Sequence, residues 1–496
     1  MSQIETYQVI VLGGGKGGKT LAIELGQKGV KTALIERSAE MIGGSCINVA
    51  CIPTKTLITS ARAAQAARHA GDFGVRTGEV TVDWSAVRRR AESVVSAMRG
   101  MNHKNFTSAG SLDFILGNGR FVGSRVIEVG VANGVVRQLT AEKIFINTGT
   151  RPAQPNIPGL DEVGALNSES IQRLDELPEH LVVLGGSYVA LEFAQMFRHF
   201  GSKVTVLERA PQLLKKEDAD VVEALGGVLR EEGIEIQLNC SVERVEKEGE
   251  GIAVVLTKNG KSTRVSGSRL LVALGRTPNT EELNLAAAGV ETDKRGFIKV
   301  NERLETTASD IWALGDVNGG PQFTHASLDD YRIVKANVFD EGQRTTADRL
   351  VPFTLFTEPE LARIGLTETD ARQQGLDIRV AKLPVAAIPR AKTMSETRGL
   401  IKAVVNAKTD RILGCAILSV EAGEMLGAVQ MALIAGLPFT ALRDAVLSHP
   451  TLVEGFNNLF ANTPQAGPVS PSTSSENGSH STIAASDEST RNETSE

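Results

Sequence analysis

The chain has 496 residues, a formal net charge of -6 at pH 7 and an aromatic content of only 4%. This length is enough for three or four domains of ordinary size, each with its own core. The negative charge, the lack of a Lys/Arg block and the few aromatic side chains argue against a nucleic-acid-binding protein. No apolar run reaches the roughly 18–20 residues that span a bilayer, and no signal-peptide pattern precedes the first strand. We therefore expect a cytoplasmic protein that contacts neither nucleic acid nor a membrane.

Two segments of the chain repeat one order of predicted elements, namely strand, glycine turn, helix and strand. Each unit ends in a glutamate directly after its second strand, Glu36 in the first unit and Glu208 in the second. A βαβ unit that occurs twice predicts two dinucleotide-binding modules. We expect strand 7–12, helix 16–28 and strand 31–35 in the first unit, and strand 181–184, helix 188–200 and strand 203–207 in the second.

The first turn carries the complete fingerprint GxGxxG. Gly13 permits a tight turn, Gly15 lets the backbone approach a pyrophosphate, and Gly18 lets the helix pack close to the strand. The N-terminus of the helix offers unpaired N–H groups to the phosphates. Glu36 comes 23 positions after Gly13, where a carboxylate can accept a hydrogen bond from a ribose hydroxyl. These features together predict a nucleotide site.

The second turn, Gly185-Gly186-Ser187, is a degraded version of the same fingerprint. Ser187 replaces the second glycine and Ala190 the third, and both are small enough to let the backbone approach a phosphate. We therefore assign a nucleotide here as well. Glu208 favours a free ribose 2′-hydroxyl and so NADH over NADPH, although Arg209 beside it could contact a 2′-phosphate. The alternative is a structural relic that binds nothing.

Between the two units, Cys46 and Cys51 lie five positions apart in the run GGSCINVACIPTK. The pair lacks the further ligands of a tetrahedral zinc site, and no secretory leader indicates an extracellular disulfide framework. A redox pair and two ordinary thiols both remain. In an ideal α-helix, residues five apart have Cα atoms roughly 8–9 Å from each other, which is beyond the span of a disulfide. Pairing would therefore require a distortion around 47–50, with which a helix interrupted at Pro53 is consistent.

The rest of the chain contributes a long helical region at 83–106, further strands and a polar tail. From about Val351 the composition shifts to strands and one apolar helix, typical of a packing domain. Cys240 and Cys415 lie in strand-like runs, and we expect both to be buried. The stretch 463–496 has almost no large apolar residue and is predicted to be disordered. The further predicted elements are strands 121–122, 126–129, 401–405 and 412–418 and helix 422–434.

In this order the motifs resemble the class I pyridine nucleotide-disulfide oxidoreductases, which include lipoamide dehydrogenase, glutathione reductase and mercuric reductase. The resemblance covers residues 7–461 and implies an α/β fold with two Rossmann-like domains, for FAD and NAD(P), and a C-terminal α+β dimerisation domain. The implied boundaries are 1–150 and 276–345 for the FAD domain, 151–275 for the NAD(P) domain, 346–462 for the dimerisation domain and 463–496 for the tail. The motifs are GGSCINVACIPTK, INTGTRP (Ile146–Pro152), VALGRTPN (Val272–Asn279), IWALGDV (Ile311–Val317) and SHPTLVEG (Ser448–Gly455).

The resemblance also implies roles for single residues. Cys51 would be the thiol nearest the flavin, and Cys46 the interchange thiol that attacks the substrate. Lys55 would stabilise the reduced flavin, unless it is only a solvated helix lysine. His449, oriented by Glu454, would act as the base for Cys46 of the other subunit in a homodimer. The other explanation is a helix start whose dipole Glu454 complements. The implied cofactor contacts are Gly13, Gly15, Gly18, Glu36, Lys55, Thr148, Gly149, Gly185, Gly186, Ser187, Glu192, Glu208, Gly275, Gly315 and Asp316, and no resident metal ligand is assigned.

Within the family, the chain is most similar to the branch of the reactive-chlorine-resistance copper(II) reductase, through GKGGKTLA, CIPTKTL and QFTHASLDDYRIV. The segment GGSYVALEFAQMF is similar to mercuric reductase, but that enzyme's N-terminal metal-binding domain and C-terminal cysteine pair are not found in this sequence. We expect an FAD-dependent NAD(P)H oxidoreductase that passes electrons through Cys46 and Cys51 to Cu(II) or Hg(II). Two alternatives stay open, a dihydrolipoamide dehydrogenase-type enzyme and a redox-sensing flavoprotein.

Overall fold

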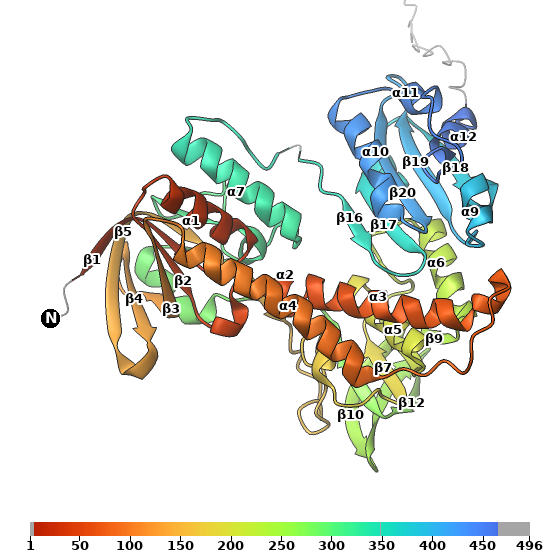
Figure 1. The fold of residues 1–496 in the computed structure, drawn as a ribbon, viewed down its shortest axis with the longest axis horizontal. Coiled ribbons are helices and arrows are strands. Elements are labelled where there is room, and N and C mark those ends of the chain that lie inside the picture. The colour runs from red at the N-terminus through yellow and green to blue at the C-terminus, as the bar shows by residue number, and fades with distance from the viewer. Residues whose placement is uncertain (1–3, 348, 465–496) are drawn as a thin grey trace, which may run out of the picture.

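The two predicted βαβ units form in the computed structural model, which describes residues 4–347 and 349–464 (Figure 1). In both units the two strands pair in parallel. The predicted bounds differ from the observed ones by at most two residues. The units consist of β1 (Glu5–Leu12), α1 (Lys16–Gln27) and β2 (Thr32–Glu36), and of β7 (His180–Leu184), α5 (Tyr188–Phe200) and β8 (Lys203–Leu207).

The first sheet has a parallel part in the order β3-β2-β1-β5-β15, and β4 pairs antiparallel with both β3 and β5. The C-terminal parts of the central strands, residues 9–12 and 144–146, are apolar and buried, as expected for a parallel sheet covered by helices. Because these parallel strands end at one edge, the segments that follow β1, β2, β5 and β15 meet there. The added elements are β3 (Leu112–Phe121), β4 (Val126–Val131), β5 (Val136–Ile146), β15 (Ile311–Ala313) and α7 (Thr324–Phe339).

The second sheet is parallel throughout, in the order β13-β7-β8-β9. A three-stranded antiparallel sheet lies beside it, and two short strands, β6 and β14, pair where the chain crosses between the nucleotide-binding regions. The two strands lie within the motifs INTGTRP and VALGRTPN. The elements are β6 (Thr150–Pro152), α6 (Ala219–Glu231), β9 (Ile234–Gln237), β10 (Cys240–Glu248), β11 (Gly251–Lys258), β12 (Lys261–Gly267), β13 (Arg269–Val272) and β14 (Arg276–Pro278).

Three helices connect the two regions. α3 (Cys51–Arg68) and α4 (Trp84–Thr107) run together from the first sheet towards α5 (Figure 1), and α2 (Ser45–Asn48) is a single turn before α3. The chain is distorted between α2 and α3, with φ -126° and ψ -103° at Ala50, so the expected break around 47–50 is present. The interpretation of Pro53 was wrong, because it lies in the first turn of α3, where a missing N–H costs no hydrogen bond.

The C-terminal block is a five-stranded antiparallel sheet in the order β16-β17-β20-β19-β18, covered by helices. The apolar helix is observed over the predicted residues, and Cys415 is buried in β20, as Cys240 is at the start of β10. The described residues contain no helix that is both long and apolar enough to cross a membrane. The predicted tail falls almost wholly outside the described residues. The elements are β16 (Phe353–Leu355), β17 (Glu360–Gly365), α8 (Glu368–Gln373), β18 (Ile378–Pro384), α9 (Pro389–Thr393), β19 (Leu400–Asn406), β20 (Ile412–Ser419), α10 (Ala422–Ile434), α11 (Thr440–Arg443) and α12 (Gly455–Ala461).

Candidate active site

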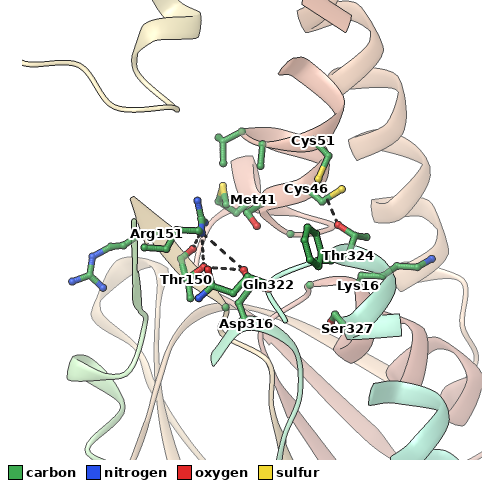
Figure 2. Close-up of a pocket in the computed structure, with 18 of the residues that line it drawn as sticks. Lys16, Met41, Cys46, Cys51, Thr150, Arg151, Asp316, Gln322, Thr324 and Ser327 are labelled. Carbon is green, nitrogen blue, oxygen red and sulfur yellow. Dashed lines mark hydrogen bonds and ion pairs between the residues drawn. The ribbon is translucent and has the colours of Figure 1, made fainter. Parts of the chain in front are cut away.

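A cavity of about 1670 Å³ begins at the first glycine turn and passes both predicted redox cysteines (Figure 2). Pockets for a single small ligand usually measure about 300–1000 Å³, so this one has room for a dinucleotide and a second ligand. The sequence-predicted residues that line it are Gly13, Gly15, Glu36, Cys46, Cys51, Lys55, Thr148, Gly149, Glu192 and Asp316. The other predicted residues support its walls or lie elsewhere.

The first turn requires its glycines. Gly13 has φ +98°, and a Cβ at that position would lie 2.4 Å from the carbonyl oxygen of Asn147. A Cβ on Gly15 would lie 2.8 Å from Asn147 Oδ1, and one on Gly18 would lie 2.6 Å from the Gly13 carbonyl oxygen. The N–H of Gly14 donates to Glu36 Oε2 at 2.9 Å, and burial raises the pKa of Glu36. The turn, the helix start and the acid are therefore arranged as a dinucleotide site requires.

Asn147 is a residue of this site that the sequence prediction missed. Its Oδ1 accepts from the N–H of Gly18 at 2.9 Å, and its Nδ2 donates to the Leu314 carbonyl oxygen at 2.6 Å. It thereby ties the first turn to the end of β15. A polar residue directly after the buried strand β5, at the edge where the parallel strands end, was the available signal.

The segment after β15 brings Asp316 into the cavity. The N–H of Gly315, which has φ +69°, donates to Asp330 Oδ2 at 2.7 Å. Asp316 Oδ2 accepts from Thr150 Oγ1 at 2.8 Å, and burial raises the pKa of Asp316 (Figure 2). A half-buried acid at this point is suited to accept hydrogen bonds from sugar-like hydroxyls. Together with Glu36 and the glycines of the first turn, Asp316 gives the cavity the polar groups and the close backbone that FAD requires.

The crossover explains three further predicted residues. Thr148 Oγ1 donates to the Asn279 carbonyl oxygen at 2.9 Å, and the N–H of Asn279 donates to the Gly149 carbonyl oxygen at 3.0 Å. Gly275 has φ +126°, and its carbonyl oxygen accepts from the N–H of Ala153 at 2.9 Å. Thr148 and Gly149 therefore line the cavity, whereas Gly275 shapes the crossover without lining it.

Cys46 and Cys51 lie side by side, next to Thr324 at the start of α7 (Figure 2). Cys51 Sγ is 3.6 Å from Thr324 Oγ1. The hydrogen bond from Cys46 is the main cause that lowers the pKa of Cys51, and Thr324 and the Lys55 charge act in the same direction. The same bond, followed by burial, raises the pKa of Cys46. In the dithiol form the negative charge therefore rests on Cys51 while Cys46 keeps its proton.

Lys55 is not a solvated helix lysine. Its Nζ lies 2.9 and 2.7 Å from the two carboxylate oxygens of Glu192, which comes from α5 and is 7% exposed. The N–H of Phe356 donates to Glu192 Oε1 at 3.0 Å, and the Lys55 ammonium lies 4.7 Å from the centroid of the Phe356 ring. The pair thus joins the cysteine helix α3 to the helix of the second nucleotide unit.

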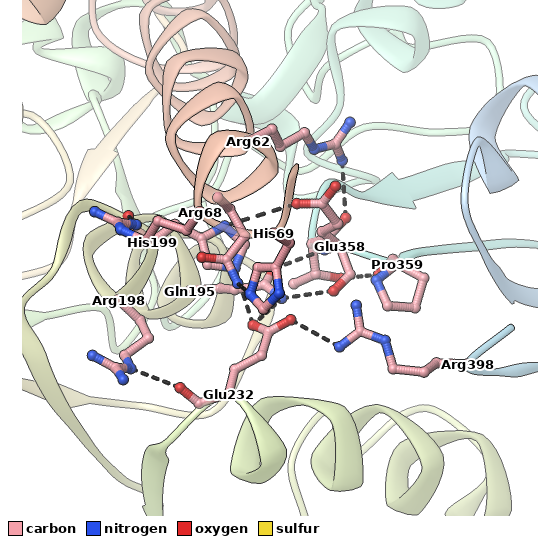
Figure 3. Close-up of polar contacts among 12 residues, drawn as sticks. Arg62, Arg68, His69, Gln195, Arg198, His199, Glu232, Glu358, Pro359 and Arg398 are labelled. Atoms are coloured by element: carbon pink, nitrogen blue, oxygen red, sulfur yellow. Dashed lines mark hydrogen bonds and ion pairs between the residues drawn. The ribbon is translucent and has the colours of Figure 1, made fainter. Parts of the chain in front are cut away.

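A buried polar cluster holds the segment that carries Phe356 (Figure 3). Gln195 accepts from the N–H of Glu358 at 2.7 Å and donates to its carbonyl oxygen at 2.8 Å, as a paired strand would. Arg62 Nη2 donates to the Thr357 carbonyl oxygen at 2.9 Å, and His199 Nε2 lies 3.0 Å from Glu232 Oε2. Side chains of α3 and α5 therefore hold this segment from two sides and fix Phe356 beside Glu192.

The second turn also requires a glycine at its first position. Gly185 has φ +112°, and a Cβ there would lie 2.6 Å from the Ala273 carbonyl oxygen. Glu208 accepts from the N–H of Gly186 at 2.6 Å and from the N–H of Ala210 at 2.7 Å. Ser187 is exposed at the start of α5. This turn and Glu208 do not line the cavity, but the next residues on α5, Tyr188 and Val189, do.

His449 and Glu454 form the predicted pair, with Nδ1 and Oε2 2.9 Å apart. The His449 side chain is 69% exposed, and neither residue lines the cavity. The pair is therefore not brought to the cysteines of its own chain. Glu454 directly precedes α12, so the helix-start explanation also describes its position. Among the described residues, no group of three or more His, Cys, Asp or Glu side chains is arranged to hold a metal ion.

Comparison with known proteins agrees with this geometry. Residues 7–330 match the family model of pyridine nucleotide-disulphide oxidoreductases, and residues 351–460 match the dimerisation domain of the same family. The probable pyridine nucleotide-disulfide oxidoreductase RclA of Escherichia coli is 44% identical over 92% of this chain and 99% of its own length. A mercuric reductase of Staphylococcus aureus is 35% identical over 90% of this chain and 81% of its own length.

Solved structures of the same family have the same fold as this chain. The Cu(II) complex of the HOCl-induced flavoprotein disulfide reductase RclA from Escherichia coli superimposes with a TM-score of 0.85 and 42% identity. The match covers 92% of this chain and 99% of that chain. The expected fold, with two Rossmann-like regions and a C-terminal dimerisation domain, is thereby confirmed. The chain belongs to the pyridine nucleotide-disulphide oxidoreductase family, and it is an NAD(P)H-dependent flavoprotein oxidoreductase of the disulfide reductase type.

Proposed function

We propose that this enzyme passes electrons from NADH through Cys46 and Cys51 to a thiophilic metal ion, Cu(II) or Hg(II). The observation that carries the proposal is the contact between the two cysteines inside the cavity, beside the Lys55–Glu192 pair. The similarity to a reductase that was solved as a Cu(II) complex, and to mercuric reductases, supports a metal ion as the acceptor.

The chemistry that FAD supplies when bound is two-electron transfer from a nicotinamide to a disulfide. Glu36 and Asp316, with the glycines of the first turn, would hold it. After reduction, Thr324 and Lys55 stabilise the negative charge on Cys51, and Cys46 carries the proton. Cys46 must lose this proton to attack, because only a thiolate is nucleophilic. The Cys51 thiolate and the Cys46 thiol then return to the disulfide by giving one electron to each of two Cu(II) ions, or both electrons to one Hg(II), with the release of the one proton that Cys46 carried.

The base for Cys46 is His449 of a second copy of the chain in a homodimer. In its own chain His449 is exposed and lies outside the cavity, as a residue that serves another subunit would. Exposed apolar side chains on the C-terminal block support an interface between two copies there, because such patches are costly in water. They are Met431, Ile434, Leu437 and Val446.

NADH is the preferred reductant. Glu208 already stands at the end of β8 and is fixed by the two backbone N–H groups of Gly186 and Ala210. A carboxylate in this place accepts from a ribose 2′-hydroxyl and repels a 2′-phosphate. Arg209 is exposed beside it and is the residue through which NADPH would still bind more weakly.

A dithiol/disulfide enzyme of the dihydrolipoamide dehydrogenase type is the second candidate. The His449–Glu454 pair favours it, since disulfide substrates need a proton donor for the leaving thiol. A dihydrolipoyl dehydrogenase of Bacillus subtilis is 32% identical over 90% of this chain.

Turnover of the purified FAD-loaded protein distinguishes the candidates. We expect NADH consumption with Cu(II) and Hg(II) to exceed that with lipoamide or glutathione disulfide in kcat/KM, and NADPH to support a lower rate than NADH. A higher kcat/KM for lipoamide than for the metal ions would indicate that the substrate is a disulfide and not a metal ion. Lack of turnover with all four acceptors would instead favour a redox-sensing flavoprotein.

A further inference from the structure

Lys19 on α1 is a buried cation that the function proposed above does not use. It belongs to the run GKGGKTLA, and its neighbours on the buried face of α1 are glycines, alanine and leucines. Only 8% of it is exposed. A buried ammonium costs free energy unless hydrogen bonds and charges compensate, so its contacts are informative.

The Lys19 ammonium connects α1 to two other segments. Its Nζ donates to Asn102 Oδ1 on α4 at 2.7 Å and to the Gly43 carbonyl oxygen at 3.3 Å. The Nδ2 of Asn102 donates in turn to the Met98 carbonyl oxygen at 2.7 Å, which orients the amide oxygen towards Lys19. The lysine thus holds the backbone three residues before Cys46.

The segment that Lys19 holds determines where Cys46 lies. Gly43 and Gly44 both have positive φ, +93° and +89°, and a Cβ on Gly44 would lie 2.7 Å from the Gly15 Cα. The following helix α2 has only four residues and no side-chain cap, so it is not stable by itself. Asn48 Nδ2 donates to the Ile42 and Gly44 carbonyl oxygens at 2.9 and 2.8 Å. The position of this turn therefore depends on its hydrogen bonds to Asn48 of α2 and to Lys19 of α1.

The charge of Lys19 acts on Cys46 as well. Burial is the main cause that lowers the pKa of Lys19 to about 8, Lys16 acts in the same direction, and negative charge on Cys46 opposes it. Conversely, the Lys19 charge lowers the pKa of Cys46, against the raising effects of Cys51 and burial. Lys55 and Glu192 lie on the side of Cys51. The other titratable groups expected near Cys46 are His449 and Glu454 of the second copy in the proposed homodimer.

We propose that Lys19 is a positioning residue for the interchange thiol: it holds the Gly43–Gly44 turn in place, and its ammonium stabilises the thiolate that Cys46 becomes when it attacks the acceptor. Lys19 then stabilises the thiolate of Cys46 in the same way as Lys55 stabilises the thiolate of Cys51. The inference rests on the proposed function of Cys46.

The rate at which iodoacetamide alkylates Cys46 tests this. The FAD-loaded protein is reduced with NADH without oxygen, and labelling at Cys46 is followed by mass spectrometry from pH 5 to 10. Removing a positive charge raises a thiol pKa, so Lys19→Met moves the profile to higher pH by about one unit, which is roughly tenfold slower labelling near neutrality. The difference should narrow above about pH 8, where the wild-type lysine itself loses its charge. Lys19→Gln keeps a donor for Gly43 without the charge, and we expect the same shift with a higher plateau rate than in Lys19→Met.

Lys28→Met is the matched control, because it removes an exposed lysine just after the same helix. Its profile should coincide with that of the wild type. Unchanged profiles in both Lys19→Met and Lys19→Gln would overturn the role of Lys19. If Lys19→Met does not retain FAD, the Lys19→Gln profile decides alone. Wild-type protein in which NADH does not expose Cys46 to labelling would contradict the proposed function of Cys46 itself, which is a separate outcome.

Discussion

Cys46→Ser abolishes acceptor reduction, with an expected loss of at least about 1000-fold in kcat, comparable to the loss of a catalytic nucleophile in other enzymes. A serine forms no disulfide, so the variant has no two-electron store in place of the Cys46–Cys51 pair. FAD should remain bound and should still be reduced by NADH, because Cys46 takes no part in the glycine turn or in the contacts of Glu36 and Asp316. Steady-state turnover with Cu(II) measures acceptor reduction, and the flavin absorbance measures separately whether FAD is bound and reduced by NADH.

Cys240→Ser is the control for this substitution. The Cys240 thiol is buried and donates to the Leu238 carbonyl oxygen at 3.3 Å, a bond that a serine hydroxyl can also make. We expect this variant to retain turnover. Full turnover in Cys46→Ser would contradict a disulfide mechanism and would assign acceptor reduction to a route that avoids the cysteines.

His449→Ala has the second largest expected effect, and it depends on the acceptor. A general base or acid contributes about 100- to 10000-fold, so we expect a loss in this range for lipoamide, whose leaving thiol must be protonated. Metal ions need less proton transfer and should lose far less. Stopped-flow rates with both acceptors measure the difference. Equal losses for disulfide and metal ion would argue against the role assigned to His449.

Mixed dimers test which subunit His449 serves. In a dimer of one His449→Ala chain and one Cys46→Ser chain, one site combines an intact Cys46 with the intact His449 of the other chain. Random exchange of equal amounts should therefore restore about a quarter of wild-type lipoamide turnover, since half of the dimers are mixed and each has one complete site. No restoration would mean that the pair acts within its own chain or that the chains do not form this dimer.

Local sequence patterns were sufficient to predict the nucleotide turns. Gly13 and Gly185 have positive φ, which is a local requirement of the tight turn, although the atoms that a Cβ would meet there belong to Asn147 and Ala273, outside the two βαβ units. The break between Cys46 and Cys51 was expected from helix geometry on the condition that the two cysteines pair, and the structure contains it. The interpretation of Pro53 was wrong because proline occurs both at kinks inside helices and in the first turn of a helix. Only the residue at which the helix begins distinguishes the two cases.

The contacts of the supporting residues could not be predicted, because their partners are remote in sequence. Asn147 binds Gly18 across 129 positions, Thr324 reaches Cys51 across 273, and Phe356 contacts Glu192 across 164. Their sequence neighbourhoods contain no periodicity or spacing that reports these contacts. The domain boundaries at 150, 275 and 345 likewise stay predictions. None of the motifs reports which acceptor the enzyme reduces.

The most direct test of electron transfer from the flavin to Cys46 and Cys51 is an anaerobic titration of the wild-type protein with NADH, combined with a count of reactive thiols. We expect one equivalent of NADH per subunit to generate two new thiols, mapped to Cys46 and Cys51, with the flavin largely reoxidised at that point. Bleaching of the flavin without new thiols would contradict this electron transfer. The two cysteines would then be ordinary thiols, and the enzyme a simple NADH oxidase or diaphorase.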